Sequence, residues 1–137
     1  MSIVLDASMV LAWLFTEERT RAAQEIMRNI ALDGAIVPSL WHLEVANALH
    51  IAMRRKRCDE DYVDRSLERL TRLPIAVDYQ TSDHAWGATK ALARGHTLSL
   101  YDAAYLELAL RLKKPLACCD AALLRAAKGR GVKTLSA

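Results

Sequence analysis

Short runs of apolar, often β-branched residues alternate with longer helical patterns along the whole chain. Runs of this length that end at a polar or turn residue are typical of buried strands. Strands that alternate with helices indicate a parallel sheet covered by helices on both faces. We therefore expect an α/β fold, namely a three-layer α/β/α sandwich around a short parallel sheet. The expected strands are residues 3–5, 35–37, 75–77, 116–119 and 132–135.

The expected helices fill the segments between these strands. Ser39 opens the longest of them, which ends in a basic cluster, and Pro74 ends the helix after it. Gly95 is the expected C-cap of a later helix. The expected helices cover residues 8–15, 17–30, 39–57, 59–73, 82–93, 100–113 and 121–128.

Composition excludes several classes of protein. Of the 137 residues, 53% are hydrophobic and 26% are charged, which excludes a disordered chain. This length favours a single domain that covers residues 1–137. The apolar N-terminus carries Asp6 and lacks a basic segment, so it predicts a strand and a helix rather than a signal peptide or a membrane span. We therefore expect a cytoplasmic protein. The three cysteines show no C-x-x-C spacing, so neither a disulfide framework nor a zinc site is indicated.

Four acids stand out because they lack a basic residue at helical pairing distance and also lack a simpler explanation from their context. Asp6 and Asp120 follow predicted strands, Asp102 lies in the first turn of a helix, and Glu44 lies on a helix face with Leu40, Asn47, Ala48 and Ile51. Ligands of open parallel sheets bind beyond the carboxyl ends of the strands, where Asp6 and Asp120 are expected. Other acids have simpler explanations: Glu107, for example, has Arg111 four residues later, and Asp78 lies near a loop.

Helix capping is an alternative explanation for three of these acids. Asp6 and Asp120 each precede a helix, and Ser99-x-x-Asp102 has the pattern of a capping box. Glu44 is explained least by capping, although a distant arginine is a possible partner. One metal site, by contrast, explains all four acids together. Clustered carboxylates suit Mg²⁺ or Mn²⁺, which can activate a water and stabilise charge on a phosphodiester.

A basic cluster follows Glu44 on the same predicted helix. It is a candidate for contacts with an RNA backbone, although cations are also favoured at any helix C-terminus. The net charge of +3 permits an anionic partner without demonstrating one. The cluster consists of Arg54, Arg55, Lys56 and Arg57.

Four motifs resemble those of the PIN-domain ribonucleases, in particular the VapC-type toxins of type II toxin–antitoxin pairs. They are VLDAS at 4–8, EVANAL at 44–49, LSLYDAAYLELAL at 98–110 and PLACCDAALLRAA at 115–127. The resemblance implies a PIN-like fold and a Mg²⁺- or Mn²⁺-dependent endoribonuclease. Its metal-binding and catalytic residues would be Asp6, Glu44, Asp102 and Asp120. The resemblance further implies a homodimer and a cognate antitoxin that covers the acidic pocket.

Three residues near these acids bear on the resemblance. Ser8 and Ser99 fall where small hydroxyl residues often support the site in this family, although each also suits a helix start. Family members commonly carry Thr two residues before the last acid, and this chain has Cys118 there. A thiol is the weaker hydrogen-bond partner, so the support of Asp120 is in question.

Two other functions stay open at this point. A catalytically inert PIN-type module that binds RNA or protein is compatible with Cys118 and with the modest net charge. An α/β phosphoacceptor domain with Asp6 or Asp120 as nucleophile is also conceivable, but it leaves Glu44 unexplained. The histidines show no paired ligand spacing, and no P-loop or G-x-G-x-x-G motif is present. The three tryptophans are expected in the core or in a dimer interface; they are Trp13, Trp41 and Trp86.

Overall fold

A parallel sheet lies at the centre of the protein. The computed structural model describes residues 2–15 and 20–137. Within them the strand order is β3-β2-β1-β4-β5, and every pair of neighbouring strands is parallel. The strands are β1 (Ile3–Leu5), β2 (Ala35–Pro38), β3 (Ile75–Asp78), β4 (Leu116–Ala117) and β5 (Thr134–Leu135).

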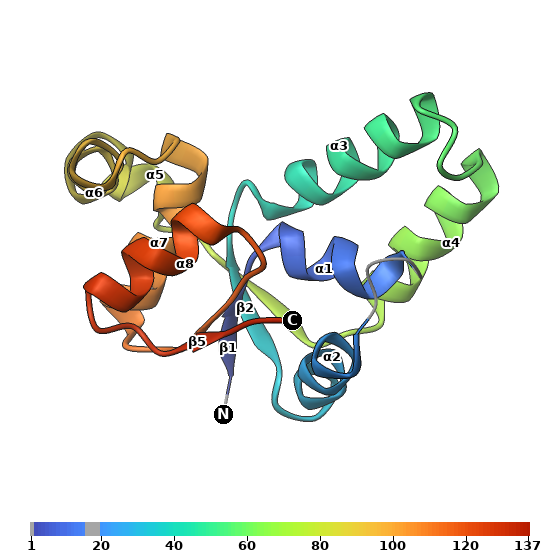
Figure 1. Cartoon of the computed structure of the whole chain (residues 1–137), viewed down its shortest axis with the longest axis horizontal. Helices are drawn as coiled ribbons and strands as arrows, with labels where there is room; N and C mark the ends of the chain where they lie inside the picture. Colours follow the sequence, from blue (N-terminus) through green and yellow to red (C-terminus); the bar gives the residue numbers. More distant parts are fainter. Residues whose placement is uncertain (1, 16–19) are drawn as a thin grey trace.

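Helices pack on both faces of this sheet. Figure 1 shows α1 and α2 on one side of the strands and α7 and α8 on the other. The predicted three-layer α/β/α fold with a short parallel sheet is therefore confirmed. The helices are α1 (Ala7–Leu14), α2 (Arg21–Asp33), α3 (Trp41–Arg54), α4 (Glu60–Thr71), α5 (Thr81–His84), the π-helical turn η1 (Ala85–Thr89), α6 (Lys90–His96), α7 (Leu100–Leu112) and α8 (Ala121–Gly129).

The largest departure from the expected elements lies in residues 82–93. One helix was expected there, but the segment divides into α5, η1 and α6. Gly95 lies inside α6, so its prediction as the C-cap is wrong. The cap is Thr97, which adopts the left-handed conformation at φ 55°. The helix runs on to this point because Leu98, which packs against the core, closes it by donating its N–H to the Ala93 carbonyl at 2.9 Å.

Smaller differences concern the ends of other elements. β2 includes Pro38, which was expected to end it. β4 stops two residues early, although the N–H of Cys118 still donates to the carbonyl of Leu135 at 3.0 Å. The first residues of the helix expected over 17–30 lie outside the described residues.

The central helix is α7. Its residues from Ala103 to Ala109 are all buried, whereas most helices of the fold bury one face only. A helix that is apolar nearly all round belongs in a core. Since α7 packs against the sheet and the helices beside it, it is a rigid support for the side chains at its N-terminal end.

The three tryptophans have different environments. Trp41 is buried, and Trp13 lies partly buried with the Arg69 guanidinium 4.6 Å from the centre of its ring. Trp86 is 89% exposed, so a place for it in the core is excluded. In residues 2–15 and 20–137, no helix combines the length and the apolar character that a membrane crossing requires.

Candidate functional site

Asp6 and Asp120 lie where two neighbouring strands end. β1 and β4 pair directly, and each acid comes within three residues of its strand. Each carboxylate also caps the helix that follows it. Asp6 accepts a hydrogen bond from the N–H of Ser8 at 3.3 Å, and Asp120 accepts one from the N–H of Leu123 at 2.9 Å. Capping and a position at the ligand-binding edge of the sheet are therefore compatible.

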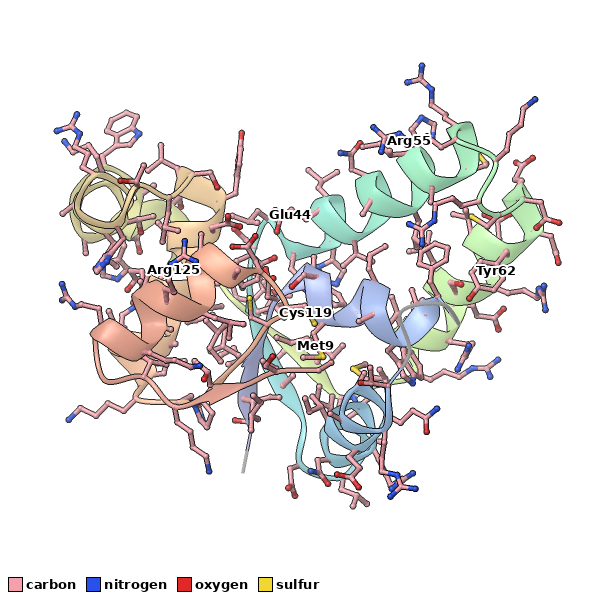
Figure 2. All side chains as sticks on the ribbon, viewed as in Figure 1. Met9, Glu44, Arg55, Tyr62, Cys119 and Arg125 are labelled. Atoms are coloured by element: carbon pink, nitrogen blue, oxygen red, sulfur yellow. The ribbon has the colours of Figure 1, made fainter. Side chains whose placement is uncertain are left out.

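Asp102 and Glu44 are contributed by helices. Asp102 lies in the first turn of α7, where its N–H donates to Ser99 Oγ at 3.1 Å. Glu44 lies in the first turn of α3 and accepts a hydrogen bond from the hydroxyl of Tyr105, on α7, at 2.5 Å. Since Tyr105 is fully buried, this bond ties α3 to the central helix. Figure 2 shows Glu44 at the end of α3 that faces α7.

The surroundings of Glu44 differ from the sequence expectation. Glu44 is half-buried, and Asn47 and Ile51 on its face are exposed. Glu44 therefore lies at the border of the buried surface of α3, and the face that it shares with Asn47 and Ile51 is partly open to solvent. The helix turns a neighbouring, bulkier stripe inward instead. That stripe consists of Trp41, Val45, Leu49 and Ala52.

Burial and the charges of neighbouring carboxylates raise the pKa of Asp6, Glu44 and Asp102. Burial raises the pKa of Asp6, and the charge of Asp120 raises it further. Burial also raises the pKa of Glu44, and the charges of Asp6 and Asp102 add to the effect. The pKa of Asp102 rises because of burial and then because of Asp6 and Asp120. No basic side chain contributes to these shifts, so the negative charge of this acidic group is not neutralised by a cation of the described chain.

Ser8 contacts Asp6, and Cys118 contacts both strand-end acids. The hydroxyl of Ser8 donates to the Asp6 carboxylate and accepts from the N–H of Cys119 at 2.9 Å. The N–H of Asp120 lies 3.1 Å from Cys118 Sγ, and the Ser8 hydroxyl lies 3.8 Å from the same sulfur. Burial raises the pKa of the Cys118 thiol, which is therefore protonated at neutral pH. The sulfur thus occupies the place where a hydroxyl would support Asp120.

Ser99 has a comparable relation to Asp102. Its hydroxyl caps α7 and, by a hydrogen bond to the carboxylate, offsets a small part of the rise that burial and the neighbouring acids cause in the pKa of Asp102. Ser8 and Ser99 therefore both touch an acid of the group, as a supporting role requires. That role stays a prediction.

The acidic group suits a hard cation by its chemistry. Oxygen ligands without histidine or thiolate are those that Mg²⁺ and Mn²⁺ prefer. Among the residues that the structure describes, however, no three Asp, Glu, His or Cys side chains are close enough to form a ready metal-binding group. Electrostatic coupling therefore places these acids near one another, while their exact arrangement around an ion stays a prediction.

The predicted basic cluster at 54–57 lies apart from the acids. Figure 2 shows Arg55 at the end of α3 opposite Glu44. Ten residues separate Glu44 from Arg54, which is roughly 15 Å along a helix. The Arg57 guanidinium lies 4.3 Å from the centre of the Phe15 ring. All four basic side chains are exposed.

Sequence reasoning missed a second buried group of charges. Asp78, at the end of β3, is 8% exposed and pairs with Arg111 at 2.6 Å. Arg111 also pairs with the buried Glu107 at 2.8 Å. Only the second pair was expected, because its members lie four residues apart. A usable sign was present: Asp78 follows an apolar strand, as Asp6 does.

The comparisons with known proteins agree with this architecture. The family model described as PIN domain matches residues 3–129. Ribonuclease VapC3 from Pyrobaculum aerophilum is 32% identical over 120 residues, which is 88% of this chain and 90% of that protein. Two crystal structures have a similar fold. PAE2754 from Pyrobaculum aerophilum has a TM-score of 0.71 at 21% identity, over 98% of this chain and 84% of that chain. FitAcB from Neisseria gonorrhoeae has a TM-score of 0.65 at 14% identity, over 97% and 96%.

Proposed function

The chain belongs to the PIN domain family, and from this premise we propose that it is a metal-dependent endoribonuclease, the toxin of a toxin–antitoxin pair. The observation that carries the proposal is the group of four acids at one edge of the sheet, in which burial and neighbouring carboxylates raise the pKa of Asp6, Glu44 and Asp102 and no basic side chain of the described residues lowers it. The similarity to a protein named ribonuclease VapC3 over most of both chains supports it.

The proposed ligands of Mg²⁺ or Mn²⁺ are Asp6, Glu44, Asp102 and Asp120. A bound ion supplies Lewis acidity, which favours the attack of water on an RNA phosphodiester. The residues of the chain hold the acids in place for this: Tyr105 positions Glu44, Ser8 positions Asp6, and Ser99 positions Asp102. Relief of the repulsion between the carboxylates favours binding of a cation.

The proposed partners are an RNA substrate, a cognate antitoxin and a second copy of the chain. The antitoxin follows from the resemblance to VapC-type toxins, and it would cover the acidic group. A homodimer is supported by large apolar side chains that are more than half exposed, because proteins that act alone seldom expose many of these. Examples are Leu43, Tyr79 and Trp86.

Cleavage of RNA by the purified protein tests this function. RNA should be cut in the presence of Mg²⁺ or Mn²⁺ and left intact in a chelator. Asp6→Asn and Asp102→Asn should each abolish cleavage while the circular dichroism spectrum is kept. If both variants cut RNA as fast as the parent protein, the assignment of the site is wrong.

An inert PIN-type module that binds RNA or protein is the second candidate. It is favoured by one observation, namely that the described acids do not form a ready metal-binding group. Calorimetric titration with Mn²⁺ at neutral pH distinguishes the two. Binding that Asp6→Asn removes supports the nuclease, and the absence of binding supports the inert module.

A further inference from the structure

Two cavities lie next to each other outside the acidic group. Both are lined by His96, the last residue of α6. The larger, of about 490 Å³, lies beside η1, α6 and the second half of α7, and His84 and Arg130 line it. The smaller, of about 380 Å³, lies between the turn after α6 and helix α8, and Arg125 lines it. The side chain of His96 lines both cavities, which are therefore neighbours. We refer to the two cavities together as the α6–α8 groove.

One end of this groove lies close to the acids. Its lining residues Thr97 and Ala122 are each two residues from a helix cap of the site, Ser99 and Asp120 respectively. Arg125 follows Asp120 by five residues, which is roughly 8 Å along α8. Figure 2 labels Arg125 on α8. The groove is thus nearer to the acids than the basic end of α3.

The charge of the groove is positive. Neither α6 nor α8 contains Asp or Glu. Arg125 and Arg130 have no ion-pair partner within residues 2–15 and 20–137. Glu107, an acid in the wall of the larger cavity, is neutralised by Arg111. The groove can therefore attract a polyanion.

The basic end of α3 is less suited to this task. Arg57 there is held over the ring of Phe15. Three acids follow directly at the start of α4, and they oppose the approach of a polyanion. These acids are Asp59, Glu60 and Asp61.

His84 contributes an unused polar atom to the larger cavity. Its Nε2 is buried, yet it has no hydrogen-bond partner among the described residues. Buried polar atoms nearly always have a partner. His84 directly precedes the π-helical turn η1, and such turns are frequent at functional sites. The cavity volume lies within the range of roughly 300–1,000 Å³ that is usual for small-ligand pockets.

We propose that the α6–α8 groove binds single-stranded RNA beside the acidic group. Arg125 and Arg130 contact phosphates, and the larger cavity takes an unpaired base whose edge bonds to His84. The inference rests on the proposed endoribonuclease function, and it adds which nucleotides the protein reads: unpaired ones on one side of the cut bond. Proteins usually read RNA sequence through unpaired bases, while arginine contacts to phosphates supply affinity.

Binding of a short fluorescent single-stranded RNA, measured by anisotropy in the Asp6→Asn background, tests the phosphate contacts. The double change Arg125→Ala and Arg130→Ala should weaken binding about tenfold and lower the slope of log affinity against log salt by about 1.4. Arg94→Ala, on α6 but outside both cavities, is the matched control and should change binding much less. An equal loss in the control, or an unchanged affinity and slope in the double variant, overturns the proposal.

Photocrosslinking tests the base site. RNA that carries 4-thiouridine should crosslink to peptides that contain His84 or His96, and His84→Gln should reduce this yield while binding of the same sequence as a duplex is unchanged. Crosslinks confined to residues 54–57, or to none of the protein's peptides, overturn the proposal.

Cleavage assays separate the groove from the proposed function itself. If the Arg125→Ala, Arg130→Ala protein cuts limiting RNA at the parent rate while Asp6→Asn cuts none, the groove is wrong and the nuclease stands. If the parent protein cuts no RNA but the groove variants still bind it more weakly, the groove stands and the nuclease is wrong.

Discussion

The protein has two groups of carboxylates, each with a buried Asp at the end of a strand, and among the described residues only one of the two groups contains a cation. Asp6 is 4% exposed and directly follows β1, and Asp78 is 8% exposed and is the last residue of β3 in the same sheet. Asp78 and Glu107 share the guanidinium of Arg111. Asp6, by contrast, has the Ser8 hydroxyl and the Cys118 thiol as partners, and the charge of Asp120 raises its pKa. Burial and a position at the end of a strand are thus common to Asp6 and Asp78, and the presence of a cation separates them.

This difference indicates which group is structural. A buried carboxylate that is paired contributes to a fixed fold, because removal of its partner leaves an uncompensated charge. A buried carboxylate that is left among other acids makes the free protein less stable and favours an external cation. We therefore propose that the Arg111 network serves stability and that the acidic group serves function.

Removal of the Arg111 guanidinium, which pairs with Asp78 and Glu107, should have the largest effect on stability. Arg111→Met leaves Asp78 and Glu107 buried and unpaired, so the free energy of unfolding should fall by about 3–5 kcal/mol. Urea denaturation measures this. Arg65→Met is the matched control, because it removes an exposed pair with Asp61 and should cost less than about 1 kcal/mol. Similar losses in the two variants would show that the network is not structural.

Replacement of one acid from each group should give opposite phenotypes. Asp6→Asn should lower the cleavage rate by about 10²-fold or more. Asn caps helices as well as Asp does, so stability should be kept or slightly raised. Asp78→Asn should cost about 1–3 kcal/mol of stability and leave the cleavage rate of the folded protein unchanged. Rates per folded molecule and urea midpoints measure both. A loss of cleavage in Asp78→Asn at full folding would contradict the division of roles.

Sequence alone predicted the unpaired group better than the paired one, for a physical reason. Asp6, Asp102 and Asp120 stand at the ends of apolar elements, and that position is visible in a linear pattern. Glu107 was explained correctly by Arg111, which lies four residues away. Asp78 was placed at a loop, because its partner Arg111 lies 33 residues further along the chain. A pairing of that kind depends on how α7 packs against β3.

The alternation of strands and helices was also predicted from the sequence, because the spacing of apolar residues within a short segment distinguishes a strand from a helix. The π-helical turn η1 was not, because its hydrogen bonds leave no distinct spacing of apolar residues. The buried face of α3 was not predicted, because two neighbouring stripes of this helix are both largely apolar. The stripe that faces the core is the one that carries Trp41.

The dependence of stability on pH and on metal should distinguish the acidic group from the Arg111 network. Without a metal, Asp6, Glu44 and Asp102 of the folded protein keep their protons at pH values above their ordinary pKa values of 3.8, 4.5 and 3.8. The protonated carboxyl groups therefore contribute fully to the free energy of unfolding below about pH 4. This contribution is lost as the pH rises through the raised pKa values of the folded protein. Asp6→Asn should reduce that loss in a series of urea denaturations.

Mg²⁺ should have the reverse dependence, because it binds the ionised carboxylates. At a concentration near 100 times its Kd, it should stabilise the protein by about 2.7 kcal/mol near pH 8 and by much less near pH 5. Thermal melts with and without Mg²⁺ measure this. A shift in Tm that is the same at both pH values, or that persists in Asp6→Asn, would place the ion elsewhere.

The smallest predicted effect concerns the one residue that differs from the family pattern within the site. Cys118 Sγ lies 3.1 Å from the N–H of Asp120 and 3.8 Å from the Ser8 hydroxyl. A hydroxyl accepts hydrogen bonds better than a thiol, so Cys118→Thr should hold Asp120 more firmly and raise the cleavage rate by about threefold. Cys118→Val is the matched control, because it has the shape of Thr without the hydroxyl, and it should lower the rate. If Thr and Val behave alike in single-turnover cleavage, this position acts by packing, and its polarity does not support the acid.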